Sequence, residues 1–193
     1  MAPDYSRERV LRTTHARVCG VDEAGRGPLA GPVVACAVVL DPARIPKGLD
    51  DSKRLSPRAR ERLLNELREC SEIGLGIAEP DEICRANILW ASLAAMTRAV
   101  GALEGQPYAL VDGNRMPPGV TGEAVVRGDA TCLSIAAASV VAKVVRDQLM
   151  AGACARFPGY GLSGHKGYPT AAHRKAVARL GRSPIHREGF GRF

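Results

Sequence analysis

The stretch VCGVDEAGRGPLAGPVVACAVVL, residues 18–40, decides the fold of this chain. Residues 18–22 read as the start of a strand, and residues 31–40 are rich in β-branched side chains that favour a second strand. Between them, EAGRGPLA holds two glycines and a proline, which are typical of a turn or a kinked connection. The stretch therefore predicts two consecutive strands, with the acidic pair Asp22 and Glu23 where the first strand gives way to the turn.

Helical and strand patterns alternate along the rest of the chain. Short apolar segments that favour strands are 73–78, 108–111 and 125–126. Helical patterns run over 57–70, from Pro80 to about Val100, over 134–150 and over 170–180. Strands mixed with helices predict an α/β sheet with helices on its faces. Residues 1–16 are polar, and we expect them to be frayed.

Particular residues mark where these helices begin, end and are buried. Ser56 before Pro57 is a start signal, and Thr170 and Gly181 are the expected N-cap and stop of the last helix. The helix from Pro80 has an apolar stripe of Cys84, Ile88, Ala91 and Ala95. Residues 134–150 are apolar almost all round and rich in Ala, which predicts a buried helix that packs closely on its neighbours.

Composition narrows the class of protein. A chain of 193 residues, of which 46% are hydrophobic, fits one globular domain that needs neither disulfides nor a metal to fold. The longest apolar run, residues 28–40, is too short to span a bilayer, and the charged N-terminus shows no secretory signal. The six cysteines include no CxxC pair, which argues against a zinc site of the usual spacing. We therefore expect the cysteines to be small, reduced core residues of a cytoplasmic protein.

The net charge of +7 is concentrated in residues 151–193. That segment contains eight Lys or Arg residues and a single acid, whereas the rest of the chain is neutral overall. A basic segment of this kind indicates a polyanionic partner, most often nucleic acid. The alternative is a solvated basic tail without a partner.

Four acids lie at the ends of predicted elements, next to turn residues: Asp22, Glu23, Asp112 and Asp129. In open α/β sheets ligand sites gather at strand ends, so these carboxylates could converge. Clustered carboxylates repel one another unless a cation lies between them, and hard oxygen ligands select Mg²⁺ or Mn²⁺. Two such ions can activate a water and stabilise the leaving oxygen in phosphodiester cleavage.

Each acid also has an ordinary structural explanation. Asp129 could N-cap the helix that follows it, and Asp112 before Gly113 could be a turn aspartate. Asp22 and Glu23 are neighbours in a strand and should point to opposite faces. Both can reach one metal only if the strand bends there or Glu23 leaves it.

Several motifs together resemble those of bacterial ribonuclease HII. They are GVDEAGRGPLAGPVV (20–34), DSK (51–53) with LSP (55–57), VDGN (111–114), GD (128–129), SIAAASVVAKVVRD (134–147), HKGYPT (165–170) and SPIHR (183–187). They occur in the family's order and cover essentially the whole chain. DEAGRG is specific, and the combination is much more specific than any single motif.

The resemblance implies a ribonuclease H-like α/β fold with a central mixed five-stranded sheet flanked by helices and a helical, basic C-terminal part. It implies one catalytic domain over residues 1–193, whose segment 151–193 binds substrate. The implied activity is cleavage of the RNA strand of RNA–DNA hybrids and incision on the 5′ side of single ribonucleotides in duplex DNA. The products would carry a 3′-hydroxyl and a 5′-phosphate, and the cofactor would be Mn²⁺ or Mg²⁺. We expect a cytoplasmic monomer without membrane association.

The family motifs also assign roles to individual residues. Catalytic metal ligands would be Asp22, Glu23, Asp112 and Asp129. Nucleic-acid-binding residues would be Gly25, Arg26 and Gly27, which read the ribose 2′-hydroxyl, Lys53, which approaches a phosphate, and Tyr168, which stacks on the adjacent deoxyribose. A 2′-hydroxyl distinguishes RNA from DNA at one position, and glycines let the backbone come within hydrogen-bond reach of it.

Other readings stay open at this point. Arg26 alone would be a surface arginine and Tyr168 a core or rim tyrosine. Lys143 could reach a phosphate or simply snorkel, and we assign no catalytic role to His165, His173 or His186. The rival functions are a nucleic-acid-binding protein without catalysis and a ribonuclease H-fold nuclease or resolvase of other specificity. The four acids favour an enzyme, because a pure binder has no use for carboxylates beside phosphates.

Overall fold

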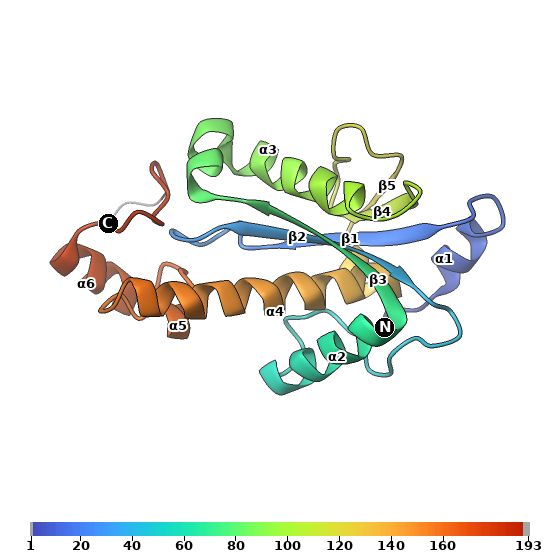
Figure 1. Cartoon of the computed structure of the whole chain (residues 1–193), viewed down its shortest axis with the longest axis horizontal. Coiled ribbons are helices and arrows are strands. Elements are labelled where there is room, and N and C mark those ends of the chain that lie inside the picture. Colours follow the sequence, from blue (N-terminus) through green and yellow to red (C-terminus); the bar gives the residue numbers. More distant parts are fainter. Residues whose placement is uncertain (1, 191–193) are drawn as a thin grey trace.

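The computed structural model describes residues 2–190, which form a five-stranded sheet with the strand order β3–β2–β1–β4–β5 (Figure 1). The strands are β1 (Val18–Ala24), β2 (Val33–Leu40), β3 (Ser71–Ala78), β4 (Tyr108–Asp112) and β5 (Gly122–Val125). The pairs β1–β2 and β2–β3 are antiparallel, whereas β1–β4 and β4–β5 are parallel. The prediction of a mixed five-stranded α/β sheet is confirmed.

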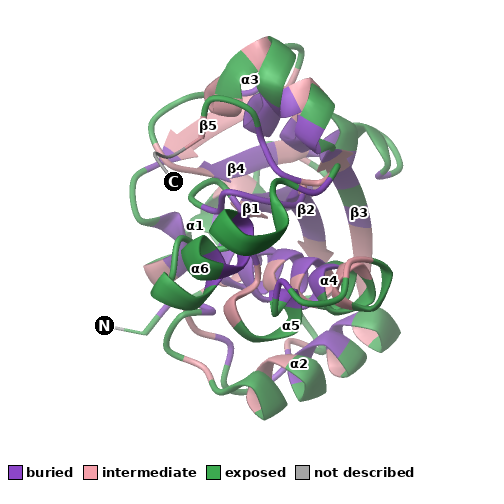
Figure 2. Cartoon of the chain, turned by 90° about the vertical axis from the view of Figure 1, so that its left-hand side faces the viewer, coloured by how far each residue is buried: buried purple, intermediate pink, exposed green. Residues whose placement is uncertain are grey.

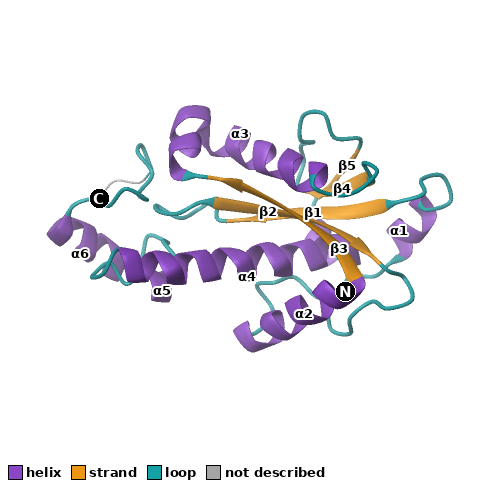
Figure 3. Ribbon diagram, in the orientation of Figure 1, coloured by secondary structure: helices purple, strands orange, loops and turns teal. Residues whose placement is uncertain are grey.

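Helices cover both faces of the sheet. They are α1 (Ser6–Leu11), α2 (Pro57–Cys70), α3 (Pro80–Gly101), the short 3₁₀ turn η1 (Gly128–Ala130), α4 (Leu133–Arg156), α5 (Leu162–His165) and α6 (Ala171–Leu180). Helix α3 lies on one face, and α4 with α2 outside it lies on the other (Figure 3). The side of α3 that faces the sheet is buried and its outer side is exposed, whereas α4 is buried all round over residues 134–142 (Figure 2). The fold is therefore three layers with a core on each side of the sheet.

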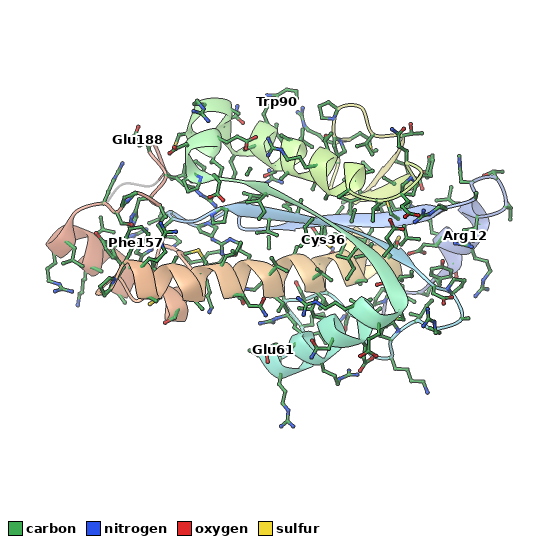
Figure 4. The ribbon with its side chains drawn as sticks, viewed as in Figure 1. Arg12, Cys36, Glu61, Trp90, Phe157 and Glu188 are labelled. Atoms are coloured by element: carbon green, nitrogen blue, oxygen red, sulfur yellow. The ribbon has the colours of Figure 1, made fainter. Side chains whose placement is uncertain are left out.

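Small side chains let the helices approach the sheet closely. A Cβ on Gly20 of β1 would lie 2.1 Å from the backbone of Ser134 in α4, and one on Gly76 of β3 would lie 1.9 Å from the carbonyl of Ala95 in α3. Cys36 on β2 is fully buried and packs in the layer between the sheet and α4 (Figure 4). The Ala-rich helix predicted from residues 134–150 is thus the buried helix α4.

The C-terminal part lies beside the connection between β1 and β2, at the far end of α4 (Figure 1). The amide of Leu29 donates to the carbonyl of Gly167 at 2.8 Å, and the amide of Gly31 donates to the carbonyl of Ile185 at the same distance. Residues distant in sequence thereby meet around the EAGRGPLA turn. The helix expected over 170–180 is confirmed as α6, whereas the short helix α5 lies in a stretch that the sequence predicts to be a loop.

The N-terminal residues were predicted wrongly. Instead of being frayed, residues 6–11 form α1, and the buried carboxylate of Glu8 accepts hydrogen bonds from the amide (2.8 Å) and hydroxyl (2.6 Å) of Ser134. Those groups lie in the first turn of α4, where amides have no partner within the helix. A polar segment is therefore ordered by capping a helix that lies 126 residues further along the chain.

Two boundary predictions need correction. Residue Val126 lies outside β5 and is 70% exposed. The apolar stripe expected on the helix from Pro80 does not include Cys84, which is exposed. Asn87 adopts φ 65° and ψ 166°, and this backbone conformation kinks the helix. The kink changes which side of the first turns faces the core, so Ile83 is buried instead.

The predicted helix starts are confirmed. The hydroxyls of Ser56 and Thr170 accept hydrogen bonds from the amides of Ala59 and His173, at 3.2 Å in both cases.

All six cysteines are free; three are buried, and the expectation of core positions is wrong for Cys84. Within residues 2–190, no helix combines the length and apolarity that a membrane crossing requires.

Candidate active site

Asp112 ends β4, and Asp22 lies two residues before the end of the neighbouring parallel strand β1. Val21 of β1 is paired with Val111 of β4, so the two aspartates are the next residues along each strand. Gly20, two residues before Asp22, faces α4, and side chains alternate along a strand. Asp22 and Asp112 therefore lie side by side on the α4 face, near the carboxyl ends of their strands.

Asp129 joins them through the turn that follows β5. The Oδ1 atom of Asp112 accepts hydrogen bonds from the amides of Gly128 (2.7 Å) and Asp129 (3.4 Å). The Nζ atom of Lys53 lies 3.2 Å from Oδ2 of Asp129. The N-cap of α4 is Cys132, so the hypothesis that Asp129 caps this helix is wrong. Asp112 acts as a turn acceptor and as a member of the acidic cluster at once.

Glu23 remains within β1, which continues to Ala24, so it does not leave the strand. Its amide donates to Oδ1 of Asp22 at 2.7 Å, and its Oε1 atom lies 3.3 Å from Nη1 of Arg26. The charge of Glu23 nevertheless acts on Asp22, and that of Asp112 acts on Glu23. All four predicted acids are thus within electrostatic range at one end of β1 and β4.

The pKa values of three of these acids are raised. Burial raises the pKa of Asp22 well above 3.8, and the charges of Glu23, Asp112 and Asp129 add to this effect. Burial also raises the pKa of Glu23, against the opposing effect of Arg26, and it raises the pKa of Asp112 together with the charge of Asp129. The four acids outnumber the two cations beside them, Lys53 and Arg26, and both burial and their mutual charges oppose ionisation.

The cluster fits a divalent cation by its chemistry. The four donors are carboxylates, the hard oxygen ligands that Mg²⁺ and Mn²⁺ prefer, and they repel one another without a cation. Among residues 2–190, no three His, Cys, Asp or Glu side chains are arranged as a ready-made metal cage. The acids share one strand end without converging on one point, so the metal-ligand assignment stays a prediction.

The loop of Gly25, Arg26 and Gly27 lies against Tyr168. Gly25 has φ +107°, and a Cβ there would lie 2.2 Å from the guanidinium of Arg146. A Cβ on Gly27 would lie 3.6 Å from the ring of Tyr168, which is 42% exposed. Tyr168 is therefore a rim tyrosine and not a core one. The structure brings together the residues for which the sequence predicts contact with a ribose and its neighbour.

Lys53 projects from a loop that is fastened to the fold. Its side chain is 78% exposed. The loop is held by a 2.7 Å hydrogen bond between the buried hydroxyls of Ser52 and Ser139, and by Arg60, which donates to the carbonyl of Ser52 at 2.9 Å. Lys143, the other lysine considered for phosphate contact, instead pairs with Asp147 at 2.5 Å.

The sequence did not reveal the role of Arg187. The charge pattern places it among the bases expected to face a polyanion, but its side chain is fully buried. The guanidinium donates to the carbonyls of Gly25 (2.7 Å), Pro28 (2.9 Å), Gly31 (2.8 Å) and Arg26 (3.2 Å). Burial, helped by the charge of Arg146, lowers the pKa of Arg187 to about 9. Its position in the SPIHR motif was the only available signal.

Arg146 of α4 also binds backbone carbonyls of the turn between β1 and β2. It is 1% exposed and donates to the carbonyls of Pro32 (2.9 Å), Lys166 (3.0 Å) and Ala30 (3.2 Å). Two buried cations therefore hold the turn through backbone carbonyls, which compensate part of the cost of their desolvation. The expected basic surface remains, because other bases of the C-terminal segment are exposed: Arg156, Arg174, Lys175, Arg179 and Arg182. Arg192 lies outside the described residues.

Comparison with known proteins matches residues 19–193 to the family model described as ribonuclease HII. The chain belongs to the ribonuclease HII family. A curated ribonuclease HII of Maricaulis maris is 57% identical over 177 residues, which are 90% of this chain and 81% of the relative. The curated enzyme of Rhizorhabdus wittichii is also 57% identical, over 90% of this chain and 87% of its own length.

A solved structure agrees with the fold. The structure of the PCNA:RNase HII complex from Archaeoglobus fulgidus matches with a TM-score of 0.77 at 26% identity, over 92% of this chain and 96% of that one. The family assigns a divalent-metal-dependent hydrolase, an endoribonuclease of the type 2 ribonuclease H class with a nucleic-acid substrate. The rival interpretation as a binder without catalysis is therefore wrong.

Proposed function

We propose that this enzyme cuts the RNA strand of RNA–DNA hybrids and incises duplex DNA on the 5′ side of a single embedded ribonucleotide. The products would carry a 3′-hydroxyl and a 5′-phosphate. One observation carries the proposal: the loop of Gly25, Arg26 and Gly27 begins two residues after the acidic pair and packs against exposed Tyr168. The loop and tyrosine that would contact a single ribose thus lie directly beside the acids.

The acids Asp22, Glu23, Asp112 and Asp129 would hold Mg²⁺ or Mn²⁺. The chemistry that such ions supply when bound is activation of a water and stabilisation of the departing oxygen. Lys53, which is exposed beside Asp129, would hold a backbone phosphate. Arg26 orients Glu23 through their ion pair.

The backbone of the glycine loop is suited to reading a hydroxyl. Arg187 draws the carbonyls of Gly25 and Arg26 inward. In a planar trans peptide the C=O of one residue and the N–H of the next point in opposite directions. The amides of Arg26 and Gly27 are therefore directed away from the buried guanidinium, toward the side from which a 2′-hydroxyl would approach. Tyr168 would stack on the adjacent deoxyribose.

The remaining features complete the proposal. We take residues 1–193 as one catalytic domain that acts as a cytoplasmic monomer, in which the free thiols stay reduced. The exposed bases of residues 151–193 would bind the duplex through phosphates, so binding should weaken with salt. Mn²⁺ as an alternative to Mg²⁺ is suggested by a Bst-RNase HIII solved in complex with Mn²⁺, which shares the fold at TM-score 0.63 and 19% identity.

A cleavage assay tests this function. Three labelled duplexes are incubated with Mg²⁺, with Mn²⁺ or with chelator: one with a single ribonucleotide, one RNA–DNA hybrid and one of DNA alone. We expect cleavage of the first two with either metal, and a cut 5′ of the single ribonucleotide. Cleavage of the all-DNA duplex, or full activity of Asp112→Asn, would refute the proposal.

A further inference from the structure

Two buried histidines lie behind Tyr168. His173 of α6 is fully buried, His186 is 6% exposed, and their Nε2 atoms lie 3.0 Å apart. The Nδ1 atom of His173 lies 3.0 Å from the carbonyl oxygen of Tyr168. The Nδ1 atom of His186 lies 2.9 Å from the amide nitrogen of Ser183.

The direction of each hydrogen bond follows from these partners. Nδ1 of His186 has three contacts to Ser183: its amide at 2.9 Å, its hydroxyl at 2.8 Å and its carbonyl oxygen at 3.3 Å. The amide can only donate and the hydroxyl can donate as well, so Nδ1 accepts from these two shorter contacts, and a neutral His186 carries its proton on Nε2. That proton is donated to Nε2 of His173, which must then carry its own proton on Nδ1. His173 in turn donates to the carbonyl of Tyr168. One chain of donors thus runs from Ser183 through His186 and His173 to Tyr168.

A third histidine fixes the other side of the same loop. Nδ1 of His165 accepts from the amide of Gly167 at 3.2 Å, so its Nε2 donates to the carbonyl of Tyr160 at 2.8 Å. Its ring stacks on His173 with centroids 4.2 Å apart. The backbone on both sides of the Gly167–Tyr168 peptide is therefore held by imidazoles whose protons are ordered.

The segment that carries His186 also carries Arg187. Arg187 holds the carbonyls of the glycine loop, and His186 holds Tyr168 through His173. One short stretch of chain thus contacts both sides of the proposed sugar-reading site. A shift in either contact would change the gap between Gly27 and the Tyr168 ring.

We propose that His173 and His186 are positioning residues that hold Tyr168 against the loop of Gly25, Arg26 and Gly27 and so set the selectivity for a single ribonucleotide. This inference rests on the proposed function of that loop and ring. The two histidines touch neither substrate nor metal in this scheme, and they act only through Tyr168.

The chain of donors requires neutral rings. A proton added to Nε2 of His173 would place two N–H groups against each other across the 3.0 Å contact, and a proton added to Nδ1 of His186 would face the amide N–H of Ser183. Charged or titratable groups close to the pair include His165 of α5, Tyr160 before α5 and Arg182 after α6. On the α3 side, the pocket that His186 lines is also lined by Asp81, Cys84, Arg85 and Glu188. Burial lowers the pKa of both histidines, and for His186 the neighbouring His173 and Arg182 add to it. The chain is therefore intact at neutral pH and opens as the pH falls below the ordinary histidine value of 6.5.

The test is a double-mutant cycle. Selectivity is defined as kcat/KM on a duplex with one ribonucleotide divided by kcat/KM on a uniform RNA–DNA hybrid. His173→Phe keeps the stacked ring and removes both hydrogen bonds, so selectivity should fall about fivefold, the scale of one net hydrogen bond. In a Tyr168→Ala background the same change should have no further effect. His15→Phe is the matched control, since His15 stacks on Tyr108 at the start of β4 and lies outside this network.

Two further measurements use the wild-type protein alone and so do not depend on whether a variant folds. Imidazole ¹⁵N NMR at pH 7.5 should show His173 protonated on Nδ1 and His186 on Nε2. Selectivity should fall between pH 7.5 and pH 5.5, and the ratio of two substrates cancels the pH dependence of the shared acids. His173 protonated on Nε2, or additive effects of His173→Phe and Tyr168→Ala, would overturn the inference. A wild-type enzyme without any selectivity would instead refute the proposed reading of the ribose, from which the inference follows.

Discussion

Replacing Asp22 by Asn removes one charge from the acidic cluster and keeps the shape of the side chain. The Oδ1 atom of asparagine can still accept the 2.7 Å hydrogen bond from the amide of Glu23. Asp22 is 7% exposed, and its pKa is raised by burial and by Glu23, Asp112 and Asp129. We therefore predict that Asp22→Asn abolishes cleavage and yet stabilises the metal-free protein.

The sign follows from the direction of the pKa shift. A carboxyl whose folded pKa is raised favours the folded state fully below its unfolded value of 3.8, and that contribution is lost as the pH rises through the folded pKa. At pH 8 the ionised Asp22 therefore opposes folding, and the neutral amide does not. Removing such an unfavourable active-site charge typically raises the free energy of unfolding by about 1 kcal/mol. For a chain of this size, that raises Tm by roughly 3 °C.

Thermal unfolding in chelator at pH 8 and pH 4 measures this effect. The gain of Asp22→Asn over wild type should be present at pH 8 and vanish at pH 4. Added Mn²⁺ should raise the Tm of the wild type more than that of the variant, since a ligand stabilises the state that binds it. Glu61→Gln on the outer side of α2 (Figure 4) is the charge-matched control, with an expected change under about 0.5 kcal/mol. An Asp22→Asn variant less stable than wild type at pH 8 in chelator would refute the reasoning.

Three further predictions concern contacts between distant elements. Gly20→Ala places a Cβ 2.1 Å from the backbone of Ser134 and should lower the free energy of unfolding in urea by about 3 kcal/mol. Gly101→Ala is the control, since a Cβ there has nothing within 4 Å, and it should not destabilise the protein. Equal effects of the two substitutions would contradict the close approach of β1 and α4. Glu8→Ala removes the carboxylate that caps α4 and should cost about 1–2 kcal/mol in the same assay, and unchanged stability would rule out that role. Arg187→Lys keeps the charge but cannot reach four carbonyls, so cleavage at a single ribonucleotide should fall about tenfold with hybrid binding retained; an equal loss of binding would show a general role instead.

Local sequence signals predicted the elements that depend on near neighbours. The glycine- and proline-containing turn between β1 and β2 and the helix starts at Ser56 and Thr170 each follow from residues within a few positions. The four acids could be selected because each stands at the end of an element, where turn residues follow. Their mutual pKa effects agree with that selection, while the metal geometry stays a prediction.

Other features have no local signal. Arg187 and Arg182 are both arginines of one basic segment, yet one is fully buried under the glycine loop and the other is exposed. The kink at Asn87 exposes Cys84, although the spacing of apolar residues favoured an unbroken stripe.

The sequence by itself predicted the five strands and the helices α2, α3, α4 and α6 in their order, the acidic and glycine-rich motifs and the family. Only the tertiary structure decided which polar side chains are buried and what they hold, as with Glu8 on α4, Arg187 on the glycine loop and His173 on Tyr168. The physical reason is that these side chains bond to backbone groups of distant residues. Any residue type offers the same amide and carbonyl, so no pattern of side chains records such a contact before the chain has folded.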